Sequence, residues 1–562
     1  MVTMPSNSNL RLGGRILADQ LRIQGVDTIF CVPGESYLGL LDGLYDHRDA
    51  IRVIVTRHEG GAANMADAYA KLTGRPGVCA VTRGPGATNA SNGIHTAFQD
   101  STPMIVLIGQ VARSARDREA FQEIEYRDMF APMAKWVGEI GSAERIPEYV
   151  SRAFHVAQSG RPGPVILALP EDILLEPAQA GDAPRAVAAR AAPPPALMAR
   201  LRELLAAAER PMVIAGGATW DAGAARRLQD FAEANDLPVA VSFRAQDRFD
   251  NRHDHYAGHA GIGFDPKLKA RLQNSDLLIV AGARLGEMTT QGYTLLDIPS
   301  PRQTLIHVHP DPNEIGRVHA PALGINAGMP EFAACLASLE PVQPGRWAAW
   351  RAEAHGEYLD FIRPTPMHGD VNLAEVVAHL SQVLPDDAII ANGSGNNTVW
   401  LHRFFQYKAF GTQVAATSGS MGYGVPAAVA AGLVHPDRTV ICVNGDGCFL
   451  MLGQELATAV QYGSAPIIIV VNNSMLATIR MHQERRFSGR VIATELVNPD
   501  FPGLARAYGA HGERVRRTDE FPAAFERARV SGKPAVIEII VDPESLNPRE
   551  TITDLRQAAR SA

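Results

Sequence analysis

Short apolar runs alternate along most of the chain with longer segments of helical periodicity. Such runs are typical of strands buried on both faces, and the longer segments are typical of helices that cover a sheet. Their alternation predicts an α/β fold of doubly wound parallel sheets. The expected strands are IRVIV (51–55), GVCAVT (77–82), MIVLIG (104–109), PVILALP (164–170), PMVIAGG (211–217), DLLIVAGA (276–283), TLIHVHP (304–310), AIIANG (388–393), TVICVNG (439–445) and PIIIVVNN (466–473).

Two segments interrupt this alternation and predict linkers. Residues 177–196 are rich in alanine and proline, and PVQPGRW (341–347) carries two prolines before a charged helix. A chain of 562 residues also suggests about three domains, at ~150–200 residues for each. We therefore expect domains at residues 1–180, 190–345 and 365–550.

The first and third domains resemble each other in layout. GRPGPVILALPEDIL closes the first, and GKPAVIEIIVDPESL closes the third. GVCAVTRGPGATNASNGIHTAF shares a strand, glycine-rich turn and helix with TVICVNGDGCFLMLGQELATAV. Two matches in the same order predict a duplicated α/β domain on either side of a different central one.

Composition and charge exclude several classes of protein. The 53 basic and 60 acidic residues give a net charge of −7, with no basic footprint for nucleic acid. No apolar run approaches the ~18 residues that span a bilayer, and MVTMPSNSNLRLGG lacks the apolar core of a signal peptide. The five scattered cysteines are typical of reduced thiols. We expect a cytoplasmic protein that binds neither nucleic acid nor membranes.

One acidic residue and one amide follow two consecutive expected strands. Asp446 stands in NGDG after the first strand, and Asn473 ends the second. A right-handed strand–helix–strand unit places the carboxyl ends of its strands close together, where ligands of parallel sheets bind. Gly445 and Gly447 let the backbone turn sharply and approach a phosphate. Carboxylate, amide and phosphate oxygens form the hard ligand set that Mg²⁺ prefers.

Each of these pieces alone predicts only a turn, because Gly-Asp-Gly and Asn-Asn are both good turn formers. The spacing distinguishes the two interpretations. Asn473 follows Asp446 by 27 residues, and this pattern resembles the thiamine diphosphate signature. It indicates a metal ion that holds a diphosphate.

A second motif provides the acid that such a cofactor requires. Glu59 follows an expected strand in VIVTRHEGGAANMADAYAKLTG, and the small residues after it allow close helix packing. A poorly hydrated carboxylate there can share a proton with the pyrimidine ring of the cofactor. The simpler interpretation is an acid at a helix start, favoured by the helix dipole. In a chain that also carries the metal motif, we interpret Glu59 as the activating glutamate.

The whole chain, from about residue 10 to 545, resembles the acetohydroxyacid (acetolactate) synthase branch of the thiamine diphosphate-dependent enzymes. The matching segments include GVDTIFCVPGESY, TRGPGATN, PMIVLIGQV, FQE, RPGPVILALPEDI and GSMGYGVPAAVAAG. The resemblance implies a pyrimidine-binding domain, a central domain and a diphosphate-binding domain, in that order. It also implies active sites between two subunits, with a homodimer as the minimal unit and a homotetramer expected.

The resemblance also implies roles for individual residues. Asp446, Asn473 and the carbonyl of Met475 would bind Mg²⁺, and Met421 would hold thiamine diphosphate in its bent form. Pro33 and Gly34 with Gln122 would line the substrate side, and Glu59 and His482 complete the residues nearest the chemistry. The remaining implied cofactor contacts are Ser394, Gly395, Asn396, Asn397, Gly419, Gly445, Gly447 and Cys448.

Two features depart from the family pattern. His482 replaces a tryptophan, with Arg480 nearby, and Glu35 replaces the second glycine of a Gly-Gly turn. Arginine and histidine near the cofactor suit a carboxylate or another polar substrate, but RMHQERR is also typical of a solvated helix face.

In the central domain, Asp311 is a candidate contact for FAD or an ADP group, or it opens a Pro-Asp-Pro turn.

These observations predict a decarboxylase or carboligase that acts on a 2-oxo acid and passes the acyl unit to a proton or a second carbonyl compound. The first alternative is cleavage of an acyl-CoA, as in oxalyl-CoA decarboxylase or 2-hydroxyacyl-CoA lyase. An alternative of another class is a catalytically silent cofactor-binding subunit, which would be expected to lack Glu59 or a metal ligand. The sequence retains both.

Overall fold

The structure is a computed structural model and describes residues 10–561. Residues 1–9 lie outside the described residues. They make up most of the segment MVTMPSNSNLRLGG, in which the sequence analysis found no signal-peptide core. The described chain divides into two compact units, of which the first ends at Ala189 and the second begins at Arg190. No helix in the described part is long and apolar enough to cross a membrane.

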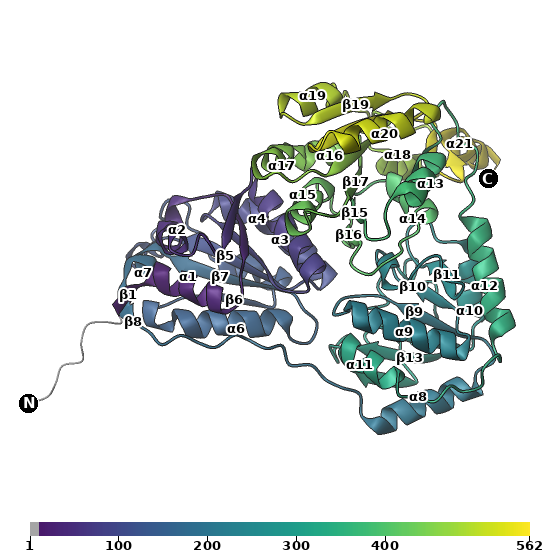
Figure 1. The fold of residues 1–562 in the computed structure, drawn as a ribbon, viewed down its shortest axis with the longest axis horizontal. Coiled ribbons are helices and arrows are strands. Elements are labelled where there is room, and N and C mark those ends of the chain that lie inside the picture. Colours follow the sequence, from purple (N-terminus) through teal and green to yellow (C-terminus); the bar gives the residue numbers. More distant parts are fainter. Residues whose placement is uncertain (1–9, 562) are drawn as a thin grey trace, which may run out of the picture. The chain divides into compact units, whose positions relative to one another are not determined.

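The first unit, which is purple to blue in Figure 1, is built on a parallel sheet with the strand order β3-β2-β4-β5-β7-β6. Its strands are β2 (Thr28–Cys31), β3 (Arg52–Val55), β4 (Gly77–Val81), β5 (Met104–Gln110), β6 (Trp136–Glu139) and β7 (Pro164–Pro170). Its helices are α1 (Gly13–Ile23), α2 (Leu38–Tyr45), α3 (Glu59–Thr73), α4 (Pro85–Asp100), α5 (Tyr126–Phe130), α6 (Ile146–Gln158) and α7 (Glu171–Leu175). The short strands β1 (Leu10–Leu12) and β8 (Pro177–Gln179) form a separate antiparallel pair.

Alternate residues of these strands face opposite layers of helices, as the two-residue period of a strand requires. Val78 and Ala80 of β4 join a core cluster with residues of α1, α2 and α6. Helices α3 and α4 pack closely against each other. A Cβ added to Gly93 would lie 2.4 Å from the Cβ of Ala63, so the contact requires glycine. This packing holds the start of α3, and with it Glu59, against the neighbouring helix.

The second unit begins with a parallel sheet of order β11-β10-β9-β12-β13-β14. Its strands are β9 (Pro211–Ala215), β10 (Val239–Val241), β11 (Tyr256–His259), β12 (Leu277–Ala281), β13 (Thr304–His309) and β14 (Leu323–Asn326). One face packs on α8 (Pro195–Ala207), α9 (Ala222–Asn235) and α11 (Met329–Leu336). The other packs on α10 (Pro266–Asn274) and α12 (Ala348–Phe361).

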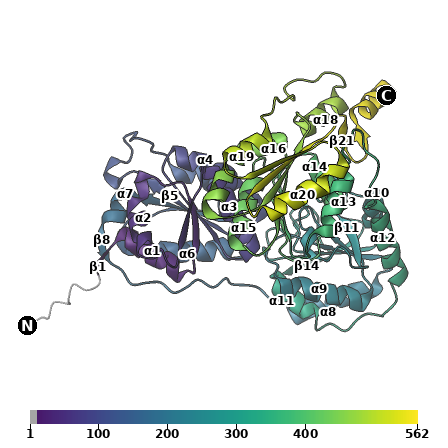
Figure 2. The same ribbon diagram turned by 45° about the horizontal axis from the view of Figure 1, so that its top comes forward.

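A third parallel sheet follows, in the order β16-β15-β17-β18-β20-β19. This part of the chain is drawn in green to yellow in Figure 2. Its strands are β15 (Ile389–Asn392), β16 (Gln413–Ala415), β17 (Val440–Gly445), β18 (Ile467–Asn472), β19 (His511–Val515) and β20 (Ala535–Ile540). Its helices are α13 (Leu373–Val383), α14 (Asn397–Phe404), α15 (Gly424–Val434), α16 (Asp446–Leu452), α17 (Leu456–Tyr462), α18 (Ala477–Arg486), α19 (Phe501–Ala507) and α20 (Phe521–Val530). The chain then forms a hairpin of β21 (Ser545–Asn547) and β22 (Glu550–Thr551) and ends in α21 (Ile552–Ser561).

The first and third sheets have the same topology. In each, the second strand in chain order lies at one edge, followed by the first, third, fourth, sixth and fifth. The central sheet has the order third, second, first, fourth, fifth, sixth, which is that of dinucleotide-binding folds. The structure therefore confirms the α/β class, the parallel sheets and the similarity of the first and third domains. All ten expected strands are present.

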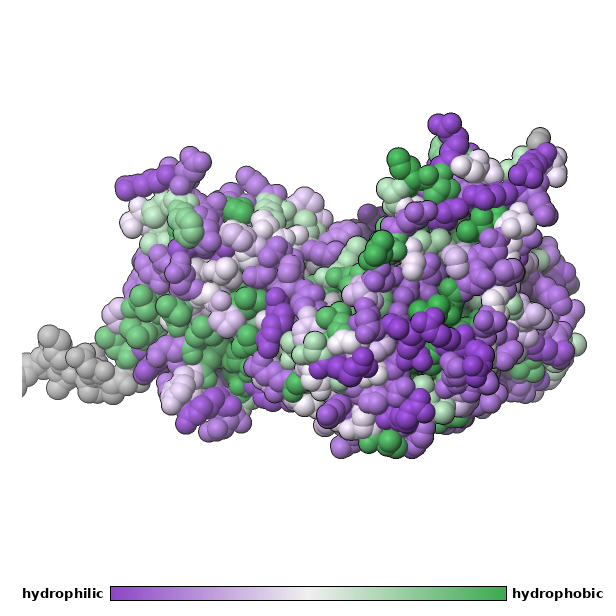
Figure 3. Space-filling model, turned by 90° about the horizontal axis from the view of Figure 1, so that it is seen from above, coloured by the Kyte–Doolittle hydropathy of each residue, from purple (hydrophilic) through white to green (hydrophobic). Residues whose placement is uncertain are grey.

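The exposed and buried side chains are those of an ordinary globular protein. Figure 3 shows hydrophilic residues over most of the face in view, with hydrophobic residues in smaller groups among them. All five cysteines lie in the described part and are free, and four of them are buried. The expectation of reduced thiols agrees with this arrangement.

Candidate active site

Asp446 and Asn473 lie at the carboxyl ends of two neighbouring strands of the third sheet, β17 and β18, as the sequence predicts. β17 and β18 pair in parallel, with Gly445 opposite Val471, so the chain leaves both strands at neighbouring points. Asp446 is the first residue of α16, and the Gly447 amide donates a hydrogen bond of 2.9 Å to its Oδ1. Asn473 Oδ1 accepts from the Met475 amide at 3.3 Å. The turn after β18 thus folds back on the asparagine side chain.

Two residues that the sequence analysis did not identify join Asp446. Asn498 Nδ2 donates to Asp446 Oδ2 at 2.8 Å and to Asn472 Oδ1 at 2.9 Å. Asn498 Oδ1 is buried and has no hydrogen-bond partner among the described residues. Asn472 is the first residue of the Asn-Asn pair, so the motif itself pointed to it, whereas Asn498 lies in a loop without periodicity or motif.

The carboxylate of Asp446 is in an unusual environment. Only 3% of the residue is exposed, and no salt bridge to it is found among the described residues. Burial raises the pKa of Asp446, and hydrogen bonds from Gly447 and Asn498 offset this only in part. A buried carboxylate without a counter-charge is costly, and a bound cation removes that cost.

The NGSGNN loop lies beside this carboxylate, between β15 and α14. Gly395 has a φ of 134°, which favours glycine, and a Cβ there would lie 2.8 Å from Asn397 Oδ1. Asn396 Oδ1 accepts from Thr478 Oγ1 at 2.8 Å. Both side-chain polar atoms of Asn397 are buried without a hydrogen-bond partner among the described residues. Orphaned amide groups of this kind fit a polar ligand such as a diphosphate.

Cys448 and Arg244 fix the position of this loop. The Ser394 and Gly422 amides each donate to Cys448 Sγ at 3.3 Å. Burial raises the pKa of the Cys448 thiol, which suits a structural role rather than a nucleophile. From the central domain, Arg244 donates to the carbonyl of Gly393 at 2.9 Å and to the carbonyl of Ala416. The sequence offered no signal for Arg244.

The remaining candidates of this domain surround the same turn. Met421 Cε lies 3.8 Å from the point where a Cβ of Gly447 would stand. Ser394 Oγ donates to the carbonyl of Ser420 at 3.0 Å, which ties the NGSGNN loop to the segment of Gly419 and Met421. The structure therefore brings together all the cofactor and metal candidates of the second unit.

In the first unit, Glu59 begins α3 after β3 and is half-buried. Its Oε2 accepts a hydrogen bond of 3.0 Å from Asn89 of α4. The preceding His58 caps the helix, since its Nδ1 accepts from the Gly60 amide at 2.9 Å. The residues from Gly60 to Ala70 are all buried, which agrees with the close packing that the small residues predict. Glu59 is therefore held in a defined position.

Pro33, Gly34 and Gln122 lie at the same sheet edge as Glu59. A Cβ added to Gly34 would lie 2.3 Å from the Thr82 Cβ, so the two residues are in close contact. A Cβ added to Gly84 would likewise lie 2.7 Å from the Gln122 Cβ. Pro33 is exposed. The turn at residues 82–86, which follows β4, therefore contacts both Gly34 and Gln122. Glu35, the departure from the family pattern, is exposed and lies 3.7 Å from Arg83 Nη2.

Helix α18 carries His482 and Arg480. His482 is exposed, while Arg480 Nε donates to Glu484 Oε1 at 3.0 Å. Arg480 is thus engaged within its own helix. In the central domain, Asp311 Oδ1 accepts from the backbone and side chain of Asn313, at 2.9 and 3.0 Å. Those bonds are typical of the turn that was one of the two interpretations of Asp311.

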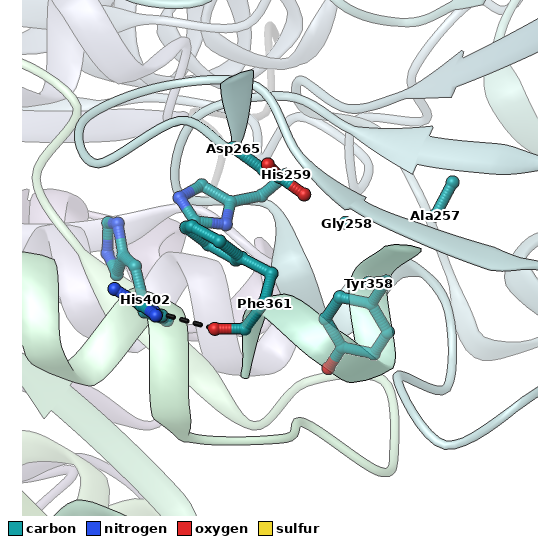
Figure 4. Close-up of a pocket in the computed structure, with 8 residues that line it drawn as sticks. Ala257, Gly258, His259, Asp265, Tyr358, Phe361 and His402 are labelled. Carbon is teal, nitrogen blue, oxygen red and sulfur yellow. Dashed lines mark hydrogen bonds between the residues drawn. The ribbon is translucent and has the colours of Figure 1, made fainter. Parts of the chain in front are cut away.

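A small cavity elsewhere in the second unit is not a cofactor site. It is lined by His259, Asp265, Tyr358, Phe361 and His402 among others (Figure 4). It has room for no more than one water molecule. Beside it, Arg403 Nε donates a hydrogen bond of 2.7 Å to the Phe361 carbonyl.

Comparisons with known proteins agree with this geometry. Residues 11–129 match the N-terminal TPP binding domain of thiamine pyrophosphate enzymes, residues 198–336 the central domain, and residues 393–539 the C-terminal TPP binding domain. The acetolactate synthase large subunit of Parasynechococcus marenigrum is 33% identical over 94% of this chain and 87% of its own. The acetolactate synthase isozyme 2 large subunit of Escherichia coli is 31% identical over 94% and 95%. A probable acetolactate synthase large subunit of Methanocaldococcus jannaschii is 33% identical over 95% and 93%. The chain therefore belongs to the thiamine diphosphate-dependent enzymes, in their acetolactate synthase-like branch.

Proposed function

We propose that Asp446, Asn473 and the carbonyl of Met475 bind Mg²⁺, which in turn holds the diphosphate of thiamine diphosphate. Carboxylate, amide and carbonyl oxygens are the ligands that Mg²⁺ takes. The observation that carries the proposal is the buried Asp446, whose pKa is raised by burial and which lacks a counter-charge among the described residues. The Met475 carbonyl accepts a hydrogen bond from Ala477 at 2.9 Å and keeps a second lone pair.

The diphosphate would lie against the NGSGNN loop. Ser394, Gly395, Asn396 and Asn397 with Gly445, Gly447 and Cys448 form this side of the site. Asn397 supports the assignment, because its buried amide otherwise has no partner among the described residues. Gly419 and Met421 would support the central part of the cofactor.

Glu59 would activate the cofactor by sharing a proton with its pyrimidine nitrogen. Once bound and activated, thiamine diphosphate supplies the carbon chemistry that cleaves the bond next to a carbonyl group. The half-buried position of Glu59 and its hydrogen bond from Asn89 hold the carboxylate in one orientation. Gln122, Pro33 and His482 would line the substrate side.

The reaction we propose is decarboxylation of a 2-oxo acid followed by transfer of the acyl unit to a proton or a second carbonyl compound. The curated relatives are named acetolactate synthases, which supports a carboligase. An acyl-CoA substrate would favour a basic track near the cofactor, but Arg480 is engaged by Glu484. The 2-oxo acid is therefore the better supported substrate. FAD is a further proposal for the central domain, supported only by the dinucleotide-type strand order.

The direct test is a panel of 2-oxo acids incubated with purified enzyme, Mg²⁺ and thiamine diphosphate, with CO₂ and products followed by mass spectrometry. We expect turnover that Glu59→Gln reduces by about 10²–10⁴-fold, the range for loss of an acid–base group. The exposed Glu144→Gln is the matched control and should retain full activity. Full activity in Glu59→Gln would refute the assigned role.

We also propose a homodimer, in the cytoplasm, whose active sites each take Glu59 from one subunit and Asp446 from the other. Inactive Glu59→Gln and Asp446→Asn proteins, unfolded and refolded together, would then regain activity. Random pairing restores about a quarter of the sites, because each mixed dimer has one intact site. No recovery on mixing, with mixed dimers verified by mass, would contradict shared sites.

A further inference from the structure

A cluster of metal-ligating side chains lies in the turn before β11, in the central domain. His253, Asp254 and His255 each offer one ligand atom, and these atoms all lie within 4.8 Å of one another. Asp254 Oδ1 is 3.3 Å from His255 Nδ1 and 3.5 Å from His253 Nδ1. Ligand atoms ~2.1 Å from a tetrahedral Zn²⁺ lie about 3.4 Å apart. The two distances therefore match the edges of a tetrahedral site.

A second carboxylate orients the first histidine. His253 Nε2 lies 2.9 Å from Glu233 Oε1 at the end of α9. If the ring proton of His253 is on Nε2, Nε2 donates to Glu233 and Nδ1 keeps its lone pair. In the structure this lone pair accepts a hydrogen bond of 3.2 Å from the His255 amide. Carboxylates in this outer position fix the tautomer and the ring orientation of metal-binding histidines. Phe249 packs edge-on against the same ring, with centroids 5.6 Å apart.

The second histidine is buried and suited to bind a metal. Only 7% of His255 is exposed, and its Nε2 has no hydrogen-bond partner among the described residues. Its Nδ1, which lies 3.3 Å from Asp254 Oδ1, is the nitrogen that would meet the ion, and Nε2 would then carry the ring proton. Neutral imidazole is the form that binds a metal.

The local charge also favours a cation. Arg351 of α12 contacts Asp254 Oδ2 at 3.0 Å, which leaves Oδ1 for another partner, and lies 3.8 Å from Asp236. Asp254 and Asp236 both pair with Arg351, and Glu233 adds a third carboxylate beside His253, with the guanidinium of Arg226 near it. Asp254 is 61% exposed, so the site is open to solvent and a water molecule can complete the ligand set.

We propose that His253, Asp254 and His255 form a binding site for a divalent transition-metal ion of the Zn²⁺ class, oriented by Glu233. Two imidazoles and one carboxylate suit Zn²⁺, Co²⁺ or Ni²⁺, whereas Mg²⁺ prefers oxygen ligands alone. The site belongs to the central domain, and it is independent of the proposed Mg²⁺ site at Asp446. The ion would tie the turn before β11 to the C-terminal end of α9.

The test is a titration of untagged, full-length enzyme with Co²⁺, in the presence of thiamine diphosphate and excess Mg²⁺, followed by visible absorption. We expect one Co²⁺ per chain with the strong absorption of a four-coordinate site, displaced by Zn²⁺. His253→Gln and Asp254→Asn, both at accessible side chains, should weaken binding by more than tenfold. Glu233→Gln should weaken it about 10–100-fold, as for other outer carboxylates.

Two controls separate this site from others. His368→Gln removes an exposed histidine that pairs with a single carboxylate, Asp542, at 2.8 Å, and should leave the titration unchanged. Asp446→Asn disables the proposed Mg²⁺ site and should also leave it unchanged. Circular dichroism confirms that each variant is folded. Absence of Co²⁺ binding, or equal binding by wild type, His253→Gln and Asp254→Asn, would overturn the proposal.

Discussion

Arg556 of the last helix binds Glu484 of α18 through two hydrogen bonds, of 2.7 and 3.1 Å. The Glu484 side chain is fully buried, and Arg480 and the Gly489 amide also donate to it. The carboxylate therefore joins α18, the loop after it and α21. Since α18 carries His482, the C-terminal helix supports a segment of the candidate active site.

Removal of Arg556 should release α21 from α18. We expect Arg556→Ala to destabilise this contact by about 1.5–3 kcal/mol, the usual loss for a hydrogen bond to a charged group. Hydrogen exchange of residues 552–561 should become faster, while the sheets stay protected. Arg560→Ala, an exposed substitution on the same helix, is the control. Unchanged exchange in Arg556→Ala would show that the ion pair does not hold the helix.

The same contact should depend on pH. Burial alone would raise the pKa of Glu484, but hydrogen bonds from Arg556, Gly489 and Arg480 outweigh it and lower this pKa to about 2. A lowered pKa stabilises the folded state above the unfolded value of ~4.3, and the benefit is lost as pH falls from there towards 2. Protection of α21 should therefore fall over this interval in wild type. Glu484→Gln should show weak protection with little pH dependence.

The contact between Gly93 and Ala63 predicts an effect on stability. A methyl group at Gly93 would meet the Ala63 Cβ at 2.4 Å, so α3 and α4 must move apart. We expect Gly93→Ala to lower the free energy of unfolding by about 1–3 kcal/mol, as for other overpacked cores. Gly141→Ala in the same unit is the matched control, because a Cβ there meets nothing within 4 Å. Denaturant melts measure both, and equal stability of the two variants would contradict the packing argument.

Asp446→Asn should have opposite effects in the presence and absence of metal. Without Mg²⁺, burial raises the pKa of Asp446, so the carboxylate destabilises the fold at neutral pH and the amide relieves this cost. We expect the metal-free variant to melt no lower than metal-free wild type. With Mg²⁺ and thiamine diphosphate, only wild type should gain thermal stability. A full gain in Asp446→Asn would remove Asp446 from the metal site.

Arg244 should affect cofactor binding from a distance. Its guanidinium donates to the carbonyls of Gly393 and Ala416, beside the NGSGNN loop. Loss of a charged hydrogen bond costs ~1.5–3 kcal/mol, or about tenfold or more in affinity if the loop loses its bound position. Calorimetry of thiamine diphosphate binding should show this loss in Arg244→Gln. Arg244→Lys, which retains a donor, should recover part of it, and unchanged affinity in both variants would contradict the positioning role.

The sequence predicted the sheets well because their strands are continuous apolar runs. The strands without such a prediction include β10 and β16, which are three residues long, and β6, whose WVGE carries little apolar character. Their place in the sheet comes from pairing with longer neighbours. Length and burial, rather than local preference, decide these elements.

Some residues of the candidate site were likewise predictable from the local sequence, and others were not. Asp446 and Asn473 were predictable because the chain returns through a helix to the adjacent strand, which fixes their proximity. Asn498 and Arg244 reach the site through long-range packing, from a loop and from another domain, and no local pattern marks such contacts. The engagement of Arg480 by Glu484 was likewise invisible, because a basic helical segment does not reveal which acid lies beneath it.

The shared strand order of the first and third sheets points to an ancestral gene that was copied and then diverged. Corresponding loops now carry different groups. The turn after β3 presents an acid, Glu59, whereas its counterpart after β16 reads TSGS; the turn after β4 reads TRGPG, whereas that after β17 carries Asp446. Both copies kept the same fold, but the first carries Glu59 and the second carries Asp446. A chimera in which one copy replaced the other would be expected to fold and to lack half of the chemistry.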